Sequence, residues 1–494
     1  MHLRLLTGSG LAISEICFTP ARKLAQLLRT RKLSATEVVR AFIAQIERVN
    51  PQVNAVVTFL PEAALKAAKA ADRKKPAGPL AGLPIAYKDM IPTKGIRTTF
   101  GSPIYADNVP GADALLVERL RAAGAITIGK TNTPEFGAGS QTFNAVFGAT
   151  RNPYDLSKTC GGSSGGAAVA VACGMLPFAD GSDFAASLRN PGNYCNVVGF
   201  RPSPGRVPAW PAANPWSAMS ELGPMARTVS DAAFLLSAMA GPDPRSPVAM
   251  SEPGSVFARD LRRDFRKVRI AWSRDLGGLP MDPRVPAALE KMLPAFERLG
   301  CIVEEAQPDF TGATQAFETL RAFIFVNRHG PLLKAHRDML KDDIVANIEQ
   351  GLRLKAEDIA AAEGMRVQLF HRMRTFLEKH EFFLCPVNQL PPYPVDTEWP
   401  KEIAGVKMGN YLDWMKSCYY ITITGHPAIS VPAAFTAEGL PVGLQIVGRY
   451  RADFSVLQLA HAFEQETQAW KRRPAAAAAP AAIEERVPRG RTRR

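Results

Sequence analysis

Apolar and polar residues alternate along this chain in two patterns, one typical of strands and one typical of helices. Short apolar runs bounded by turn residues predict buried strands; they lie at 83–88, 125–129, 268–272, 382–387, 429–435 and 442–447. Apolar residues that recur every three or four positions predict amphipathic helices; this spacing occurs at 36–48, 113–123, 228–240 and 285–299. Ser34 and Glu37 form a capping box at the start of the first of these helices. Because predicted strands and helices alternate, we expect an α/β fold with helices layered on a sheet.

The same patterns favour one large domain over residues 20–470, although a length of 494 residues alone would suggest two or three. An N-terminal extension precedes it at 1–19, and a C-terminal tail follows at 471–494. Nothing repeats internally. The segment from about 310 to 420 is mostly helical in pattern, and we expect it to form a cap over the functional site.

The net charge of +14 depends strongly on the tail. Residues 471–494 carry eight Lys or Arg against two Glu, which contributes +6 and leaves +8 for residues 1–470. The tail is of low complexity and lacks apolar periodicity, so we expect it to be disordered. The rest of the chain has no basic stripe interleaved with aromatic residues, so nucleic-acid binding is not predicted.

Cysteine use and apolar content favour a protein of the cytoplasm. The seven cysteines are scattered without CxxC spacing, which fits a reducing compartment better than a disulfide framework. The N-terminal residues lack the long apolar core of a signal peptide, and no apolar run is long enough to predict a membrane span. No cluster of metal ligands is present in the sequence, so we expect neither a metal nor another cofactor.

The candidate chemistry lies in the glycine- and serine-rich segment 160–202. It contains two serine-bearing turns, one at Ser163 and Ser164 and the other at Ser187. Glycine clusters let the backbone approach a reacting group closely, but a serine hydroxyl is a weak nucleophile that needs an adjacent base. Lys88 follows the apolar run GLPIAY, and burial can lower a lysine pKa from its ordinary value of about 10.4. We therefore expect Lys88 to lie on a central strand with its amine desolvated, as the base.

Two other motifs match in letters but not in context. Residues 124–131, GAITIGKT, fit the phosphate-binding pattern GxxxxGK[ST], yet a helix is predicted before them and Pro134 interrupts the helix that should follow. Residues 162–166 fit GxSxG, the nucleophile elbow of α/β-hydrolases, yet no strand is predicted before them. That elbow would need a histidine partner, for which His426 is the best candidate, although a histidine beside proline in a loop is more often structural.

Lys88 and the two serine turns together resemble the amidase signature family of serine hydrolases. Lys88 and Ser163 are 75 residues apart, and Ser163 and Ser187 are 24 apart, as in that family. Further similar blocks extend the resemblance over roughly residues 20–470: SATEVVRAFIAQIERVNP, GAITIGKTNTPEF, NPYDLSKTCGGSSGG, GFRPSPGRVP, GPMARTVSDAA and GHPAISVPAAFTAEGLPVGLQIVGR. The resemblance implies the amidase signature fold, in which a large, mixed, twisted β-sheet is sandwiched between α-helices.

The resemblance also implies a role for each site residue. Ser187 is then the nucleophile, Lys88 the base, and Ser163 the serine that bridges them, joined to Gly162 by a cis peptide bond. The implied oxyanion hole consists of the backbone N–H groups of Phe184, Ala185, Ala186 and Ser187. The implied supporting residues are Gly162, Ser164, Asp183 and Arg189.

The chain departs from the family at Ala185 and Ala186, where glycines usually precede the nucleophile. Alanine keeps the backbone N–H but loses easy access to positive φ. If either position requires positive φ, the alanine is strained by roughly 1–2 kcal/mol or the turn shifts. If neither does, the two methyl groups only narrow the floor of the site.

The function implied is hydrolysis of a carbon–nitrogen bond in a small amide or carbamate, through an acyl-enzyme on Ser187. Aromatic residues in and near the expected cap predict a preference for hydrophobic or aryl substrates; they are Trp210, Trp216, Trp399, Trp414, Tyr411, Tyr419 and Tyr420. One alternative is the glutaminase subunit of a tRNA-dependent amidotransferase, although DFAASLRNP differs from the DTGGSIRQPA pattern of those subunits. Another is a catalytically impaired homologue that only binds its ligand. The sequence leaves open whether the chain forms a homo-oligomer.

Overall fold

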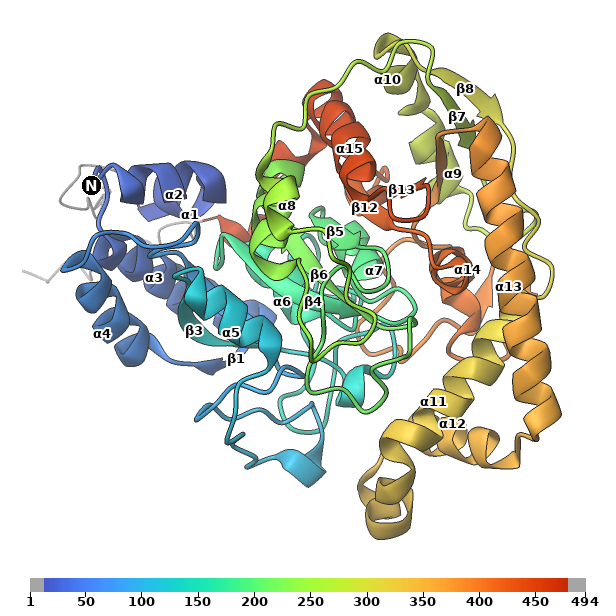
Figure 1. The fold of residues 1–494 in the computed structure, drawn as a ribbon, viewed down its shortest axis with the longest axis horizontal. Coiled ribbons are helices and arrows are strands. Elements are labelled where there is room, and N and C mark those ends of the chain that lie inside the picture. Colours follow the sequence, from blue (N-terminus) through green and yellow to red (C-terminus); the bar gives the residue numbers. More distant parts are fainter. Residues whose placement is uncertain (1–12, 479–494) are drawn as a thin grey trace, which may run out of the picture.

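An eight-stranded mixed sheet runs through the centre of this computed structural model, which describes residues 13–478 (Figure 1). In spatial order its strands are β4 (Phe178–Asp183), β6 (Glu221–Ala226), β5 (Val198–Arg201), β12 (Ala428–Phe435), β13 (Pro441–Gly448), β9 (Phe382–Pro386), β7 (Arg269–Trp272) and β8 (Ile302–Glu305). The pairs β7–β8 and β7–β9 are parallel, and the other pairs are antiparallel. The predicted class, α/β with a large mixed sheet, is confirmed.

Both faces of this sheet are buried. Phe382 and Leu384 of β9 belong to one apolar cluster, and Phe383 and Cys385 belong to a second. Because successive side chains of a strand point to opposite faces, the two clusters lie on opposite sides of the sheet. Each cluster also contains helical residues, so the sheet is sandwiched between helices.

Helices α8 (Val229–Met239) and α15 (Asp453–Thr467) contribute to the first cluster. The remaining helices of this part of the molecule are α1 (Ile13–Phe18), α2 (Ala21–Arg29), α3 (Ala35–Val53), α4 (Pro61–Asp72), α5 (Leu115–Ala122), α6 (Gly165–Ala172), α7 (Arg189–Tyr194), α9 (Arg284–Glu290) and α10 (Leu293–Arg298). The capping box of Ser34 and Glu37 is present at the start of α3. The single helix expected over 285–299 is divided into α9 and α10.

A second, three-stranded sheet carries Lys88. Its order is β1 (Val56–Phe59), β3 (Ile126–Thr131), β2 (Pro84–Lys88), so β2 lies at an edge rather than at the centre as expected. All five residues of β2 are nevertheless buried, because β4 of the large sheet packs beside it. The backbone N–H of Lys88 donates to Asp180 Oδ1 on β4 at 3.1 Å. Burial of Lys88 therefore comes from the junction of the two sheets.

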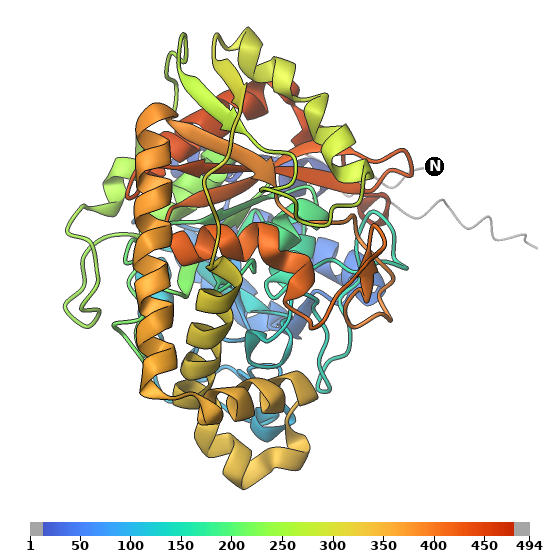
Figure 2. The ribbon, with the colours of Figure 1, turned by 90° about the vertical axis from the view of Figure 1, so that its right-hand side faces the viewer.

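A layer of long helices forms one side of the molecule (Figure 2). It consists of α11 (Ala313–His336), α12 (Asp342–Arg353) and α13 (Ala356–Lys379), with α14 (Lys416–Thr424) packed between α11 and α13. These helices fall in the segment 310–420 that was predicted to be mostly helical. The same segment also supplies β9 to the large sheet and a small hairpin, β10 (Glu402–Ile403) and β11 (Val406–Lys407).

The two ends of the described chain pack onto its body, which differs from the expected boundaries. Residues 13–18 of the expected N-terminal extension form α1, in which Ile16 and Cys17 are buried. At the other end, residues 471–478 follow the surface instead of leaving it. Arg48 Nη1 of α3 donates to the carbonyl of Ala478 at 2.6 Å. An arginine side chain thus provides a hydrogen-bond donor for a backbone carbonyl of this alanine-rich segment. The rest of the expected extension and tail, 1–12 and 479–494, lies outside the described residues.

Within residues 13–478, no helix combines the length and apolar character needed to cross a membrane. In the same range, no three His, Cys, Asp or Glu side chains are grouped so that they could hold a metal ion. The seven cysteines are all free and buried.

Candidate active site

The end of strand β2 places the Lys88 amine among three serine hydroxyls. Lys88 Nζ lies 2.7 Å from Ser163 Oγ, 3.0 Å from Ser164 Oγ and 3.0 Å from Ser182 Oγ. Ser163 and Ser164 belong to the turn that leads into α6, and Ser182 belongs to β4. The lysine side chain is fully buried. Hydroxyl groups from two separate segments thus converge on one amine.

Burial lowers the pKa of Lys88 to about 7, although the carboxylates of Asp180 and Asp183 oppose this shift. An ordinary lysine is almost entirely protonated at neutral pH. With a pKa near 7, a large fraction of the Lys88 amine is neutral and can accept a proton.

Ser163 lies in a turn in which the two preceding backbone carbonyls accept hydrogen bonds from side-chain hydroxyl groups. The Gly162–Ser163 peptide bond is cis. Ser140 Oγ donates to the carbonyl of Gly162 at 3.0 Å, and Thr142 Oγ1 donates to that of Gly161 at 2.9 Å. Gly161 has a φ of 74°, and a Cβ there would lie 2.3 Å from Asn190 Oδ1. The turn therefore requires glycine at this position.

Ser187 lies in the segment that connects β4 to α7, and its side chain retains little exposure, 7 %. Its carbonyl accepts a hydrogen bond from the N–H of Ser164 at 3.2 Å, which joins the two serine turns. In the described part of the chain, Ser187 Oγ forms no hydrogen bond, so this hydroxyl is unengaged.

Four successive backbone N–H groups in this segment are also unengaged. Among the hydrogen bonds of residues 13–478, none has the N–H of Phe184, Ala185, Ala186 or Ser187 as its donor. The next N–H, that of Leu188, donates to Asp183 Oδ2 at 3.1 Å. Unengaged N–H groups next to a nucleophile can stabilise the negative oxygen of a tetrahedral intermediate.

A buried ion pair between Asp183 and Arg189 holds the segment between β4 and α7 in place. Arg189 Nη2 lies 3.0 Å from Asp183 Oδ1, and its Nε lies 3.1 Å from Oδ2. Burial by itself would raise the pKa of Asp183, but Arg189 and Arg201 hold this pKa below its ordinary value. Arg189 also donates to the carbonyl of Ala185 at 2.8 Å. The arginine thus binds the residue before the turn and one carbonyl within the turn that carries the four N–H groups.

Ala185 and Ala186 fit this turn without positive φ, since neither is among the residues with that backbone conformation. Both side chains are buried and pack in the second apolar cluster. Neither alanine is therefore strained in its backbone, and the two methyl groups only narrow the space at the site.

Three residues of this site were not predicted from the sequence. Ser182 bonds Lys88, Asp180 accepts its backbone N–H, and Arg201 donates to the carbonyl of Asp183. Asp180, Ser182 and their neighbours stand on β4, and their proximity to Lys88 depends on how β4 packs against β2. The run ADGSD before the nucleophile, with polar residues at alternate positions, was the one available signal.

The lysine of the first rejected motif and the histidine considered for the second have structural roles. Lys130 of the GAITIGKT run lies inside strand β3, and its Nζ donates to the carbonyl of Ile91 and to Thr93 Oγ1. No phosphate-binding loop forms there. His426 Nδ1 lies 3.0 Å from the carbonyl of Thr424, and its ring packs near Phe370. His426 forms no hydrogen bond with a serine of the Lys88 group.

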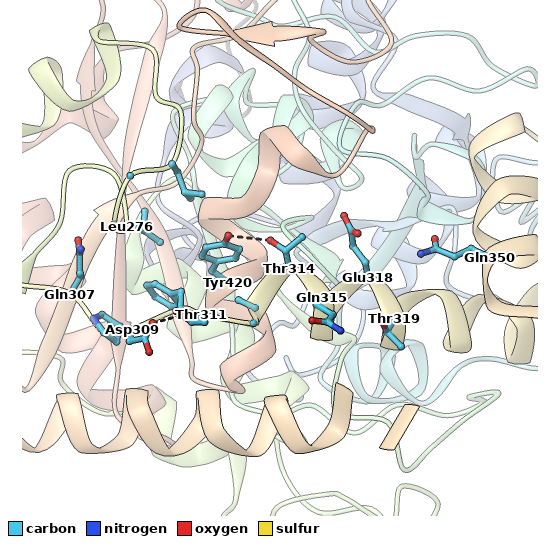
Figure 3. Close-up of a pocket in the computed structure, with 17 residues that line it drawn as sticks. Leu276, Gln307, Asp309, Thr311, Thr314, Gln315, Glu318, Thr319, Gln350 and Tyr420 are labelled. Atoms are coloured by element: carbon cyan, nitrogen blue, oxygen red, sulfur yellow. Dashed lines mark hydrogen bonds between the residues drawn. The ribbon is translucent and has the colours of Figure 1, made fainter. Parts of the chain in front are cut away.

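Cavity size alone does not identify this site. A large cavity of about 960 Å³ lies between α11, α14 and the loops at 276–279 and 307–312, and Tyr420 and Thr314 meet at its wall (Figure 3). Lys88, Ser163 and Ser187 do not line it. A smaller cavity of about 320 Å³ is lined by Ser182 and therefore reaches the Lys88 group.

Comparison with known proteins identifies the family. The profile of the family described as Amidase matches residues 37–457. The chain is 35% identical over 451 residues to an acylamidase of Rhodococcus erythropolis, covering 90% of this chain and 94% of that protein. It is 34% identical over 500 residues to a subunit of the glutamyl-tRNA(Gln) amidotransferase of Moorella thermoacetica, covering 93% and 99%.

Solved structures of amide-hydrolysing enzymes have the same fold as this chain. A bacterial aryl acylamidase of the amidase signature enzymes superposes with a TM-score of 0.87 at 29% identity, covering 94% of this chain and all of that one. The 6-aminohexanoate cyclic dimer hydrolase, complexed with substrate, gives 0.83 at 26% identity, covering 94% and 100%. The fold, the site and these similarities define a carbon–nitrogen hydrolase. The chain belongs to the amidase signature family, and the predicted family and enzyme class are confirmed.

Proposed function

We propose that this amidase acts through an acyl-enzyme on Ser187, with Lys88 as the base and Ser163 as the proton relay. The observation that carries the proposal is the 2.7 Å contact of Lys88 Nζ with Ser163 Oγ, beside a turn with four unengaged N–H groups. A neutral, desolvated lysine can activate a serine that lacks a histidine.

In the proposed reaction, Ser187 Oγ forms a bond to the substrate carbonyl carbon while its proton passes through Ser163 to Lys88. The N–H groups of residues 184–187 donate to the oxygen that becomes negative. Collapse of the intermediate breaks the carbon–nitrogen bond, and the proton returns from Lys88 to the leaving amine. Water then attacks the acyl-enzyme by the same relay and releases the acid.

We further propose amides with hydrophobic or aryl groups as substrates, with carbamates as related candidates. Support comes from the relatives named acylamidase and aryl acylamidase, and from the apolar side chains in the wall of the smaller cavity, among them Met90, Ile91 and Leu222. Two of the tryptophans expected at the site give no support, because Trp216 is exposed and Trp414 lies in the core. Free, buried cysteines support a reducing compartment such as the cytoplasm.

A second candidate is the glutaminase component of a tRNA-dependent amidotransferase. It is favoured by the coverage of 93% and 99% shared with a protein of that kind. The two candidates differ in substrate, because the glutaminase component would prefer glutamine to an anilide. Turnover of glutamine faster than of acetanilide by the purified chain would favour the glutaminase component.

The test of the mechanism combines labelling with a ratio of two rates. A fluorophosphonate should label the parent protein at Ser187 and should not label Ser187→Ala. Ser187→Ala and Lys88→Ala should each lower anilide hydrolysis on the order of 10³-fold or more, and the double variant should lose little more. An unlabelled parent protein would indicate a binding protein without catalysis.

The role of Lys88 as acid and base is tested separately. An anilide needs a proton for its leaving amine, whereas an activated ester such as a p-nitrophenyl ester does not. Lys88→Ala should therefore raise the ratio of ester to anilide hydrolysis. An unchanged ratio with substantial remaining activity would show that Lys88 is structural.

A further inference from the structure

The smaller cavity has a cationic side chain in a wall that is part apolar and part polar. Its apolar lining includes Met90, Ile91, Val207, Leu222 and Val248. Arg328 of α11 also lines it and is half-buried. Because Ser182 belongs to the same lining and lies 3.0 Å from Lys88 Nζ, this guanidinium faces the space next to the catalytic group.

Arg328 has no acidic partner. Within residues 13–478 its side chain forms no ion pair and no hydrogen bond, and its guanidinium carbon lies 5.7 Å from the centre of the Phe184 ring. Arg321, two turns earlier on α11, also lies over Phe184, at 5.3 Å. Both arginines therefore stand against the first residue of the turn with the unengaged N–H groups.

The other titratable groups of the cavity do not neutralise Arg328. Burial raises the pKa of Glu221 to about 8, so this carboxyl is mostly protonated at neutral pH. Burial lowers the pKa of His329 to about 4, so this ring is neutral. Burial and the charge of Arg321 lower the pKa of Arg328 to about 10, which still leaves it protonated. The partly buried charge of Arg328 therefore has no counter-charge in the cavity, and a bound anion would supply one.

We infer that Arg328 is a specificity-determining residue that binds a carboxylate on the amide substrate. The inference rests on the proposed function and narrows its substrate class to amides that combine an apolar body with one negative group. A guanidinium binds a carboxylate in a planar, two-bond geometry. The ligand is a monoanion because Arg321 is occupied: its Nε and Nη2 both donate to Tyr411 Oη, at 3.0 and 2.6 Å. Arg321 adds positive potential but lies outside the lining of the cavity.

The test compares anionic and neutral substrates of similar shape. One pair is 4-acetamidobenzoate and 4-acetamidotoluene, with the carboxylate on the amine side; the other is succinanilate and butyranilide, with it on the acyl side. In the parent enzyme, kcat/KM of the carboxylate should exceed that of its neutral partner about tenfold or more in at least one pair. In Arg328→Met this ratio should fall at least tenfold, and Arg328→Lys should keep part of it.

Arg374→Met is the matched control, because Arg374 is an exposed arginine of α13 that forms an ion pair with Glu378 and does not line the cavity. It should keep the parent ratio. If Arg328→Met does not fold, as judged by its melting temperature, the comparison uses Arg328→Lys and Arg328→Gln. A parent ratio near one in both pairs, or a ratio that Arg328→Met leaves unchanged, would overturn the inference while neutral amides are still hydrolysed.

Calorimetric binding to Ser187→Ala separates the inference from the proposed function. Tighter binding of succinanilate than of butyranilide, lost in the double variant with Arg328→Met, would support the carboxylate site even if no amide were turned over. Equal binding of the two compounds would count against it.

Discussion

At the scale of single residues, the protonation of Lys88 should control the rate. The amine acts as a base only when neutral, and its pKa of about 7 places that change near neutral pH. We predict that kcat for an anilide rises with pH through a midpoint near 7 and stays high in mildly alkaline solution. A pH–rate profile checks this. A rate already at its plateau at pH 5 would point to another base.

Asp180 should tune this midpoint. Its carboxylate favours the charged form of Lys88, and burial raises the pKa of Asp180 itself to about 6, so it is mostly ionised where Lys88 titrates. Removing the negative charge in Asp180→Asn should make the ammonium less favourable. The midpoint should therefore move to lower pH, on the order of one unit.

Asp89→Asn is the control for this shift. Asp89 is also buried, but its carboxylate accepts from Thr99 and faces Lys130, and it is not among the charges that act on Lys88. Its variant should keep the parent midpoint. A midpoint in Asp180→Asn equal to or above that of the parent would show that Asp180 does not act through its charge.

The residues of the site differ in how far sequence could predict them. Lys88, Ser163 and Ser187 stand in glycine- and serine-rich or strand-end contexts whose chemistry is recognisable along the chain. Ser182 and Arg328 have no such context, because each reaches the site through packing between distant segments. Ser182 depends on the junction of β2 with β4, and Arg328 depends on how α11 crosses Phe184. Neither arrangement follows from local periodicity.

At the scale of elements, the apolar pattern predicted where strands lie in the sequence, but it did not predict which strands pair with each other. The run at 83–88 became β2, yet its place at the edge of a small sheet is set by pairing with β3, which no local pattern encodes. The helix expected over 285–299 is interrupted between α9 and α10, where Pro294 lies in the first turn of α10. The ordered path of 471–478 depends on a partner in α3, so alanine-rich composition could not reveal it.

This C-terminal segment gives the prediction at the element scale. Arg48 bonds the carbonyls of Ala477 and Ala478, at 2.8 and 2.6 Å, and Tyr154 Oη donates to the carbonyl of Arg472 at 2.7 Å. A protein truncated after Trp470 should melt roughly a few degrees below one truncated after Ala478, because only the second keeps these bonds. Equal melting temperatures would show that the segment adds nothing to stability.

At the scale of the whole molecule, three apolar clusters of unequal size hold residues 13–478 together. The first joins residues from Ile16 to Ala477 and lies between the sheets and the helices α3, α8 and α15. The second lies between the large sheet and α11, α13 and α14. The third has few buried members and joins α12 to the end of α11 and to Ala138. The layer of helices is therefore anchored firmly at the sheet and weakly at α12 (Figure 2).

This inequality predicts the order in which the molecule opens. Regions with few buried apolar contacts open with the lowest free energy, and central strands open with the highest. Backbone amides of α12 should therefore exchange with deuterium well before those of β12 and β13, of which β13 is buried along its whole length. Hydrogen exchange followed by mass spectrometry measures this order. The replacement Ile348→Ala in the third cluster should speed exchange in α12 and leave β13 unchanged, and an acceleration in both would mean that the helical layer and the sheet open as one unit.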